Sequence, residues 1–440
     1  MSYLTWLVMI GTALLGGTAG VLGSFAVLRR RALVGDVVAH AALPGLCLAF
    51  LVIGARHFVG MLAGAFLAGL AGIALMTIVC RWTRTKEDAA LGLVLSAFFG
   101  AGIMLSSYIQ NIEGGGSRAG LETYIYGQAA GMLREDLFLI SAVSAVVLAI
   151  LAVFYKEFKL LSFDPGFAQA QGWPTLALDL TLMGSLTLVT VMGLPVVGVV
   201  LMAAMLILPG AAARFWTDRL ERMLLLSAVL GAAAGTIGSL ISAGVVRSWL
   251  GFDPFGFAEG QTAPTGPVIV LCGTGVFLFS MLVAPNRGLL ARLWRWWRLR
   301  TKTGDENLLR TLYEFVEGRG ADAPPVTAIE VAAARSWSPR QSGRRLRRAV
   351  SKGWVRRVAG GIELTPAGRI EAERLVRAHR LWELFLIHGA SIAPDHVDRD
   401  ADTMEHVLAP EILAELERRF GAAATSEVPQ SPHAIESANQ

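Results

Sequence analysis

The segment from Arg29 to Phe50 is apolar and long enough to cross a bilayer, yet it contains an aspartate and a histidine, Asp36 and His40. An ionisable residue at the centre of a membrane helix costs about 2.5 to 3.5 kcal/mol, so a function or a partner must offset that cost. Positions i and i+4 lie one turn apart on the same face of an α-helix. A carboxylate and an imidazole placed in this way can converge on one small cation, and these donors suit Mn²⁺, Fe²⁺ or Zn²⁺.

An alternative interpretation needs no cation. Asp36 would lie near the helix end and pair with the arginines at 29–31, while His40 would make a hydrogen-bonded contact between helices. Pro44 and Gly45 follow one turn later and weaken the helix at this depth. A broken backbone within a membrane is tolerated where it lines a cavity, which favours a pathway. Spacing alone leaves both interpretations open.

The chain up to Val283 is a series of apolar runs of about 20 residues, the length that crosses a hydrocarbon core of ~30 Å. This pattern stops after Arg287. Only Gly193, Leu194 and Pro195 separate the sixth run from the seventh, so these are either two short spans or one bent element with a re-entrant part. The sequence therefore predicts eight or nine spans. The expected spans are 4–28, 33–54, 58–80, 89–110, 133–154, 174–192, 194–212, 223–245 and 267–285.

Basic residues occur on alternate connections between these spans, which the positive-inside rule assigns to the cytoplasmic side. With nine spans the amino terminus would be outside and the carboxyl terminus inside; with eight, both would be inside. In either case we expect a multi-pass membrane protein with a cytoplasmic C-terminal domain. The basic connections contain Arg29 to Arg31, Arg81 with Arg84 and Lys86, Lys156 with Lys159, and Arg214 with Arg219 and Arg222.

The connection 155–174 belongs to this cytoplasmic set and predicts a short amphipathic helix. Asp164 is a good N-cap and Pro165 a good first helical residue, while Phe167 and Ala168 supply an apolar surface that ends at Gly172. Such a helix either receives force from a soluble ATPase or simply lies at the interface. The chain has no GxxxxGK[ST] loop and no nucleophile paired with a base, so we expect no enzyme activity and a separate ATPase.

Three segments carry a resemblance to a known family. They are residues 23–51, 160–174 and 197–213, and they resemble permeases of the metal-ion ABC importer class that moves Mn²⁺, Zn²⁺ or Fe²⁺. The resemblance implies that Asp36 and His40 line a transmembrane metal site. It also implies a bacterial plasma membrane location, a separate ATPase, an extracytoplasmic metal-binding protein and a second permease subunit. The residues that it assigns to the ATPase-coupling helix are Ser162, Phe163, Asp164, Pro165, Phe167, Ala168 and Gly172.

The C-terminal part has the composition of a soluble domain after a basic, tryptophan-rich stretch at 287–304 that suggests an interfacial anchor. The 3.6-residue period predicts a helix over 305–318. A helix at 329–334, a second capped by Ser338 and a hairpin at 355–365 then form a winged helix-turn-helix pattern. The pattern fits either contact with DNA or a protein module. The candidate DNA contacts on the second helix are Arg340, Arg344, Arg345 and Arg348.

Histidines and carboxylates then gather at helical spacing. His379 and Glu383 lie at i and i+4, and residues 402–406 repeat this pattern, so two helices could bring their side chains onto a transition-metal ion or could simply present a polar face. The region 305–420 resembles the iron-dependent repressor family of metalloregulators. The ligands that this resemblance implies are His379, Glu383, Asp402, Glu405 and His406. The sequence departs from the family at Asn307, Arg310 and Asp398, with His396 nearby.

The expected fold is an all-α polytopic membrane domain with eight or nine helices, followed by a winged helix-turn-helix and an α-helical metal-binding and dimerisation domain. The leading functional hypothesis is a permease subunit that imports a divalent transition metal and carries a cytoplasmic metal sensor. The alternatives are a membrane-tethered, metal-dependent DNA-binding regulator and a permease for another solute whose tail is an inert dimerisation module. The expected domains are 1–286, 287–304, 305–368, 369–421 and a disordered tail at 422–440.

Overall fold

The chain forms two compact units, Met1–Arg292 and Leu293–Gln440, which we describe separately. The computed structural model describes residues 3–54, 57–111, 124, 127, 129–245, 264–319, 324–388, 414–416 and 418.

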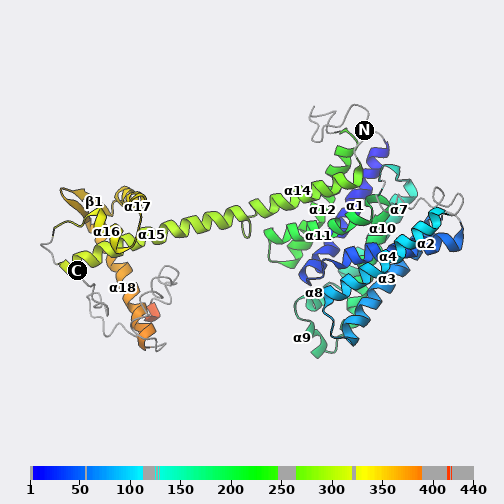
Figure 1. Cartoon of the computed structure of the whole chain (residues 1–440), viewed down its shortest axis with the longest axis horizontal. Coiled ribbons are helices and arrows are strands. Elements are labelled where there is room, and N and C mark those ends of the chain that lie inside the picture. The colour runs from blue at the N-terminus through cyan, green and yellow to red at the C-terminus, as the bar shows by residue number, and fades with distance from the viewer. Residues whose placement is uncertain are drawn as a thin grey trace. The chain divides into compact units, whose positions relative to one another are not determined.

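The first unit is a bundle of long apolar helices (Figure 1). Within the described residues, eight of them are long and apolar enough to cross a membrane, whereas α11 offers only a shorter apolar stretch, Met202–Trp216. This confirms the predicted polytopic membrane domain. These eight helices are α1 (Tyr3–Leu28), α2 (Val34–Ile53), α3 (Phe58–Trp82), α4 (Glu87–Asn111), α7 (Arg134–Val153), α10 (Thr175–Val197), α12 (Leu220–Ser242) and α14 (Thr265–Val283), and α11 spans Val199–Trp216. The short ones are η1 (Ala129–Gly131), α8 (Tyr155–Phe163) and α9 (Pro165–Ala170).

The break between the sixth and seventh apolar runs lies at Gly198, so the predicted break at 193–195 was wrong. Helix α10 continues through Gly193 and Pro195 and ends at Val197. A proline this close to a helix end removes a single backbone hydrogen bond, which the helix tolerates. Gly198 has φ 95°, a conformation open to glycine and strained for other residues. The chain therefore changes direction at the residue that permits a positive φ.

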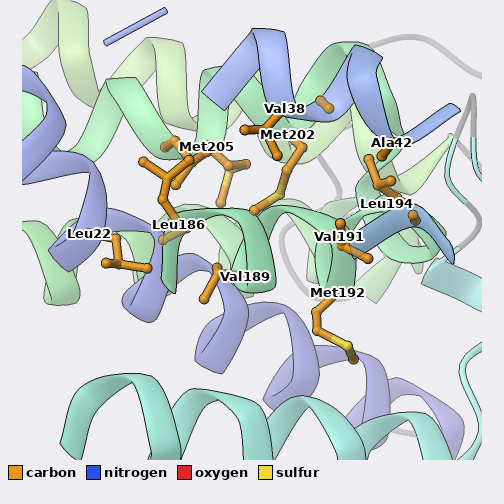
Figure 2. Packing of buried hydrophobic residues seen from close by; sticks show 14 of the residues in the cluster. Leu22, Val38, Ala42, Leu186, Val189, Val191, Met192, Leu194, Met202 and Met205 are labelled. Atoms are coloured by element: carbon orange, nitrogen blue, oxygen red, sulfur yellow. The ribbon is translucent and has the colours of Figure 1, made fainter. Parts of the chain in front are cut away.

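The core of the bundle lies where α10 and α11 meet α1 and α2 (Figure 2). Methionine thioethers from α11 fill the space between the aliphatic side chains, as expected for a residue that adapts to irregular gaps. Helix α2 turns one face into this core. The labelled residues in this cluster are Leu22, Val38, Ala42, Leu186, Val189, Val191, Met192, Leu194, Met202 and Met205.

Helices α1 and α12 approach each other closely because glycines face each other across their contact. A Cβ atom at Gly231 would lie 2.1 Å from the carbonyl oxygen of Gly16, and one at Gly20 would lie 2.4 Å from that of Ser227. Thr12 Oγ1 donates a hydrogen bond to the carbonyl oxygen of Gly235, 3.1 Å away. Small residues at four-residue spacing are a common basis of helix association in membranes, where close packing replaces the hydrophobic effect.

We expect Gly231→Leu to destabilise the bundle by about 1 to 3 kcal/mol or more, because the added side chain collides with backbone rather than with a flexible neighbour. The melting temperature of the detergent-solubilised protein measures this effect. Gly275→Leu is the matched control, since a Cβ atom at Gly275 meets nothing within 4 Å. Equal melting temperatures for the two variants would contradict the close-packing interpretation.

The second unit is a winged helix followed by a long helix. Helix α15 (Leu289–Arg319) starts before the predicted helix at 305–318 and includes most of the basic, tryptophan-rich stretch 287–304. Its residues Leu308, Leu309 and Leu312 are buried in the core of the unit. The remaining elements are α16 (Ala328–Ala334), α17 (Pro339–Ser351), β1 (Val355–Val358), β2 (Gly361–Leu364) and α18 (Pro366–His388).

The wing is the antiparallel hairpin β1–β2, in which Val355 pairs with Leu364 and Val358 with Gly361. Gly360, with φ 95°, makes the turn. Capping boxes begin both helices of the helix-turn-helix, with Thr327 at the start of α16 and Ser338 at the start of α17. The predicted winged helix-turn-helix is confirmed.

Candidate functional site

Asp36 and His40 lie together in the first two turns of α2. Oδ1 of Asp36 is 3.4 Å from Nε2 of His40, and the side chains are 32% and 16% exposed. Nδ1 of His40 is buried and has no hydrogen-bond partner within the described part of the chain. The carboxylate and imidazole thus converge as predicted, and the pair is only partly covered by its own chain.

The pair lies against α4, whereas the opposite face of α2 is in the core. The rings of His40 and of Phe99 in α4 meet edge to face, with their centres 4.9 Å apart. Val38 and Ala42, on the other face of α2, are completely buried. Helix α2 is therefore fixed by apolar packing on one side, and it presents its polar side chains beside an aromatic ring on the other.

Two of the three arginines near Asp36, Arg29 and Arg31, have other carboxylate partners. Arg29 pairs with Asp179 of α10, and Arg31 pairs with both Asp179, at 2.9 Å, and Glu87 of α4. Burial lowers the pKa of Arg31, but the hydrogen bond to Glu87 and the charge of Asp179 outweigh this effect, so its pKa is raised. These pairs favour the pathway interpretation of Asp36 over the interpretation in which it neutralises the arginine cluster.

The pair alone offers two donors to a cation. Among the described residues, no group of three or more His, Cys, Asp or Glu side chains is placed to hold a metal ion. A site for an ion in transit must release it as well as bind it, so a sparse ligand set suits passage better than a closed cage.

The connection between α7 and α10 forms two short helices, α8 and α9, rather than one. Oδ1 of Asp164 accepts a hydrogen bond from the backbone N–H of Phe167 at 2.9 Å, and Pro165 is the first residue of α9, as predicted. Gly172 follows α9 with φ 81°. Ala168 is buried, and the hydroxyl of Ser162 donates to the carbonyl oxygen of Phe158 within α8. The predicted residues Asp164, Pro165, Ala168 and Gly172 therefore shape the loop.

Three aromatic side chains point outward from this loop: Phe163, Phe167 and Trp173, which are 59%, 50% and 42% exposed. Large apolar side chains exposed on one loop are candidates for a protein contact. Phe163 and Phe167 were among the predicted coupling residues. Trp173 was not, although its position beside Gly172 and Pro174 in a basic connection was a usable signal.

A cavity of about 870 Å³ lies at the ends of the helices away from the basic connections and is lined by His57, Glu135 and Asp136, among others. Nδ1 of His57 accepts a hydrogen bond from the N–H of Gly60 at 3.0 Å, and Oδ2 of Asp136 accepts one from the N–H of Leu133 at 2.8 Å. Both side chains therefore cap helices, and helix capping explains why these two polar residues lie at the cavity wall.

The basic helix α17 divides into two faces. Arg340, Arg344 and Arg347 are exposed. Arg345 instead stacks on the ring of Trp337 at 3.8 Å, and the guanidinium of Arg348 lies 3.8 Å from the buried carboxylate of Asp305. Burial and the charge of Arg348 lower the pKa of Arg345. Of the four predicted DNA contacts, Arg340 and Arg344 thus lie on the open face, together with Arg347.

The repressor-like cluster is only partly within the described residues. Asp402, Glu405 and His406 lie outside them, as do His396, Asp398 and the predicted disordered tail, and Glu383 is described only as part of α18. His379 is buried, and its Nδ1 lies 3.0 Å from Nη1 of Arg310. Nε of Arg310 also donates to Glu314 at 2.6 Å.

This contact does not fit a metal at Nδ1 of His379. A metal needs the lone pair of the nitrogen, but the guanidinium, which has only donors, occupies that lone pair with an N–H group. Its positive charge also repels a divalent cation. In the described part of the tail, therefore, Arg310 stands where a ligand was expected, and His379 links α15 to α18.

We expect His379→Ala to leave the binding of Mn²⁺ and Zn²⁺ by the purified full-length chain unchanged in equilibrium dialysis. The same variant should lower the free energy of unfolding of the tail by about 1 to 3 kcal/mol, because a buried donor of Arg310 loses its partner. His40→Ala is the matched control, which should weaken metal binding. Loss of a bound ion from His379→Ala would contradict the assignment.

Comparison with known proteins now adds to this geometry. Residues 1–284 match the ABC 3 transport family, and residues 365–433 match the iron dependent repressor, metal binding and dimerisation domain. The chain is 41% identical to the manganese transport system membrane protein MntC of Bacillus subtilis over 394 residues, which cover 89% of this chain and 86% of that protein. It is 41% identical over 288 residues to the zinc transport system membrane protein TroC of Treponema pallidum, covering 66% and 91% of the two chains.

Among solved structures, PsaBC from Streptococcus pneumoniae in complex with Fab aligns with a TM-score of 0.54 and 29% identity, covering 65% of this chain and 94% of that one. The aligned share of this chain is similar to the share matched by the transport family. On these grounds the chain belongs to the ABC 3 transport family and carries, after its membrane domain, a domain of the iron-dependent repressor type.

Proposed function

We propose that this chain is the permease subunit of an ATP-driven importer of a divalent transition metal. The observation that carries the proposal is the convergence of Asp36 and His40 on a partly exposed face of a membrane helix. Such a pair is costly in a bilayer unless it has a function, and its oxygen and nitrogen donors suit transition ions. The manganese and zinc transport relatives support this substrate class.

The same geometry supports three partners. Phe163, Phe167 and Trp173 are exposed aromatic side chains of the loop that the charge rule assigns to the cytoplasm, where a separate ATPase would dock. A second permease subunit would cover the open side of the Asp36–His40 pair. An extracytoplasmic binding protein would deliver the ion to the opposite end, and the C-terminal unit would lie in the cytoplasm.

We expect Asp36→Asn and His40→Ala each to lower metal uptake about tenfold or more, since losing a charge-assisted contact of about 1.5 to 3 kcal/mol changes a rate or an affinity by that order. Uptake of Mn²⁺, Zn²⁺ and Fe²⁺ into cells that contain the chain with its partners measures this effect. The control is Asp218→Asn, an aspartate paired with Arg214 and Arg287 away from α2. Unchanged uptake by both test variants, with normal membrane insertion, would contradict the metal path.

A narrower proposal concerns the tail, which we suggest lowers import when cytoplasmic metal accumulates. Its match to a metal-binding and dimerisation domain supports this role, although Nδ1 of His379 is already bonded to Arg310. Sensing would therefore depend on other ligands. DNA binding, the alternative role, draws support from the exposed arginines of α17, but it leaves Asp36 and His40 without a purpose.

We expect deletion of residues 300–440 to abolish the decrease in uptake that high internal metal causes. Vesicles preloaded with low or high Mn²⁺ and containing either the full chain or the truncated one allow the comparison. The truncated chain should import at the same rate under both conditions. If both chains respond equally to internal metal, the tail is not the sensor.

A further inference from the structure

Asp179 is an acidic residue in the membrane unit to which no role has been assigned. It lies in the second turn of α10, within the otherwise apolar run TLALDLTLM, and its side chain is only 19% exposed. We propose that Asp179 is a positioning residue that joins the ATPase-facing loop, the connection 155–174 with α8 and α9, to the start of helix α2 and thus to Asp36. This inference rests on the proposed function, and it names the residue through which movement of the ATPase would reach the metal pair.

Asp179 is the centre of a charged cluster that connects the ends of four helices. Its carboxylate accepts hydrogen bonds from Arg29 and from Nη1 of Arg31, at 2.9 and 3.1 Å for the latter. Arg31 also bonds to Glu87 through Nε, at 3.1 Å. The cluster thus joins the end of α1 and the start of α2 to α10 and α4. Because the arginines and Asp179 are mostly covered, solvent screens these pairs less than it would surface pairs.

The signs of these charges match the helices that carry them. Arg29 and Arg31 follow the C-terminal end of α1, where the helix dipole favours cations. Glu87 is the first residue of α4, and Asp179 lies near the N-terminus of α10, where anions are favoured. Each ion pair therefore places a cation at the C-terminal end of one helix and an anion near the N-terminal end of another. Both charges are favoured by the helix dipoles, so the pairs hold the helices together as well as their side chains.

The link from the ATPase-facing loop to Asp179 is short and hydrogen-bonded. The N–H of Trp173 donates to the carbonyl oxygen of Ala168 in α9 at 3.1 Å, and Nε2 of Gln169 donates to Oγ1 of Thr175, the first residue of α10. The N–H of Leu178 bonds to the carbonyl oxygen of Pro174. A displacement of α9 therefore reaches the first turns of α10 without a flexible connection.

The link from the cluster to the metal pair is equally short. Arg30 has φ 60°, unusual for a residue with a side chain, and the N–H of Arg31 bonds back to the carbonyl oxygen of Ala26 at 2.8 Å. The N–H of Val34 then bonds to the carbonyl oxygen of Arg31. This tight turn leads directly into the helical turn that carries Asp36. Helix α4, held by Glu87, also packs against His40 through Phe99.

Charge-assisted hydrogen bonds are strong and directional, so they suit an element that has two discrete arrangements. Movement of α9 by the ATPase would shift α10 and, through Asp179, would tilt the start of α2 and α4 together. The geometry of Asp36 and His40 would then change once in each ATP cycle. Without the carboxylate, hydrolysis would continue but would move fewer ions.

The test is the number of ATP molecules hydrolysed per Mn²⁺ imported by the permease–ATPase complex in proteoliposomes. Asp179→Asn should raise this ratio at least threefold, and Asp179→Glu should restore it to near the parent value. Asp218→Asn is the matched control, because Asp218 also pairs with two arginines but lies at the turn between α11 and α12. A role in stability alone would lower the amount of folded complex without changing the ratio.

A second measurement separates this inference from the proposed function. Hydrogen exchange of residues 29–37 should change when the complex binds a non-hydrolysable ATP analogue, and Asp179→Asn should abolish that change. This readout needs no metal movement, so it tests the link even if the parent complex imports no metal. Failure of the parent complex to import any of Mn²⁺, Zn²⁺ and Fe²⁺ would overturn the import proposal and leave the exchange measurement to decide the link.

An unchanged ATP ratio in Asp179→Asn, with import by the parent intact, would overturn the link and leave the import proposal standing. An unchanged exchange response would overturn it as well. If Asp179→Asn does not assemble, Arg31→Gln replaces it in both measurements, because Asp179 then keeps Arg29. The same two results from that variant support or overturn the link.

Discussion

The cost of an unpartnered polar group in hydrocarbon organises the membrane unit. Charged side chains are gathered at the helix ends, where Arg29 and Arg31 meet carboxylates from α4 and α10. Hydroxyl groups within the helices bond back to their own backbone, as Thr187 and Thr190 do in α10. Against this background the pair formed by Asp36 and His40 is an exception, since Nδ1 of His40 is buried without a hydrogen bond in the described part of the chain.

The bundle combines a tightly packed core with a polar face of α2 that is partly exposed. Glycines bring α1 and α12 into backbone contact, and α10 and α11 fill the core with aliphatic and thioether side chains. This core leaves α2 fixed on the face that bears Val38 and Ala42. The polar face of the same helix, which carries Asp36 and His40, remains partly uncovered. A tightly packed scaffold therefore presents a polar pair that its own chain covers only in part.

Much of the fold could be predicted because apolar runs of membrane length and capping residues are local signals. The cap at Asp164 and Pro165 and the wing turn near Gly360 followed from such signals. The break at Gly198 did not, because Gly193 and Pro195 are stronger local breakers that helix α10 nevertheless absorbs.

The predicted site was incomplete for a different reason. Asp179 carried the same signal as Asp36, an acidic residue in an apolar run, but without a histidine one turn away it suggested no ligand pair. Its partners come from Arg29 and Arg31, far away in the sequence, and only tertiary structure reveals them. The contact between Arg310 and His379 is of the same kind.

The contact between Arg310 and His379 affects how the tail responds to loss of metal in the cell. A metal that holds a domain together is exchanged with its surroundings, and chelators or scarcity remove it. A guanidinium is a cation that cannot leave, because it is bonded to the chain and keeps its proton at any physiological pH. The junction of α15 and α18 at His379 should therefore stay assembled when the cell is starved of metal, the condition in which the proposed import would be needed most.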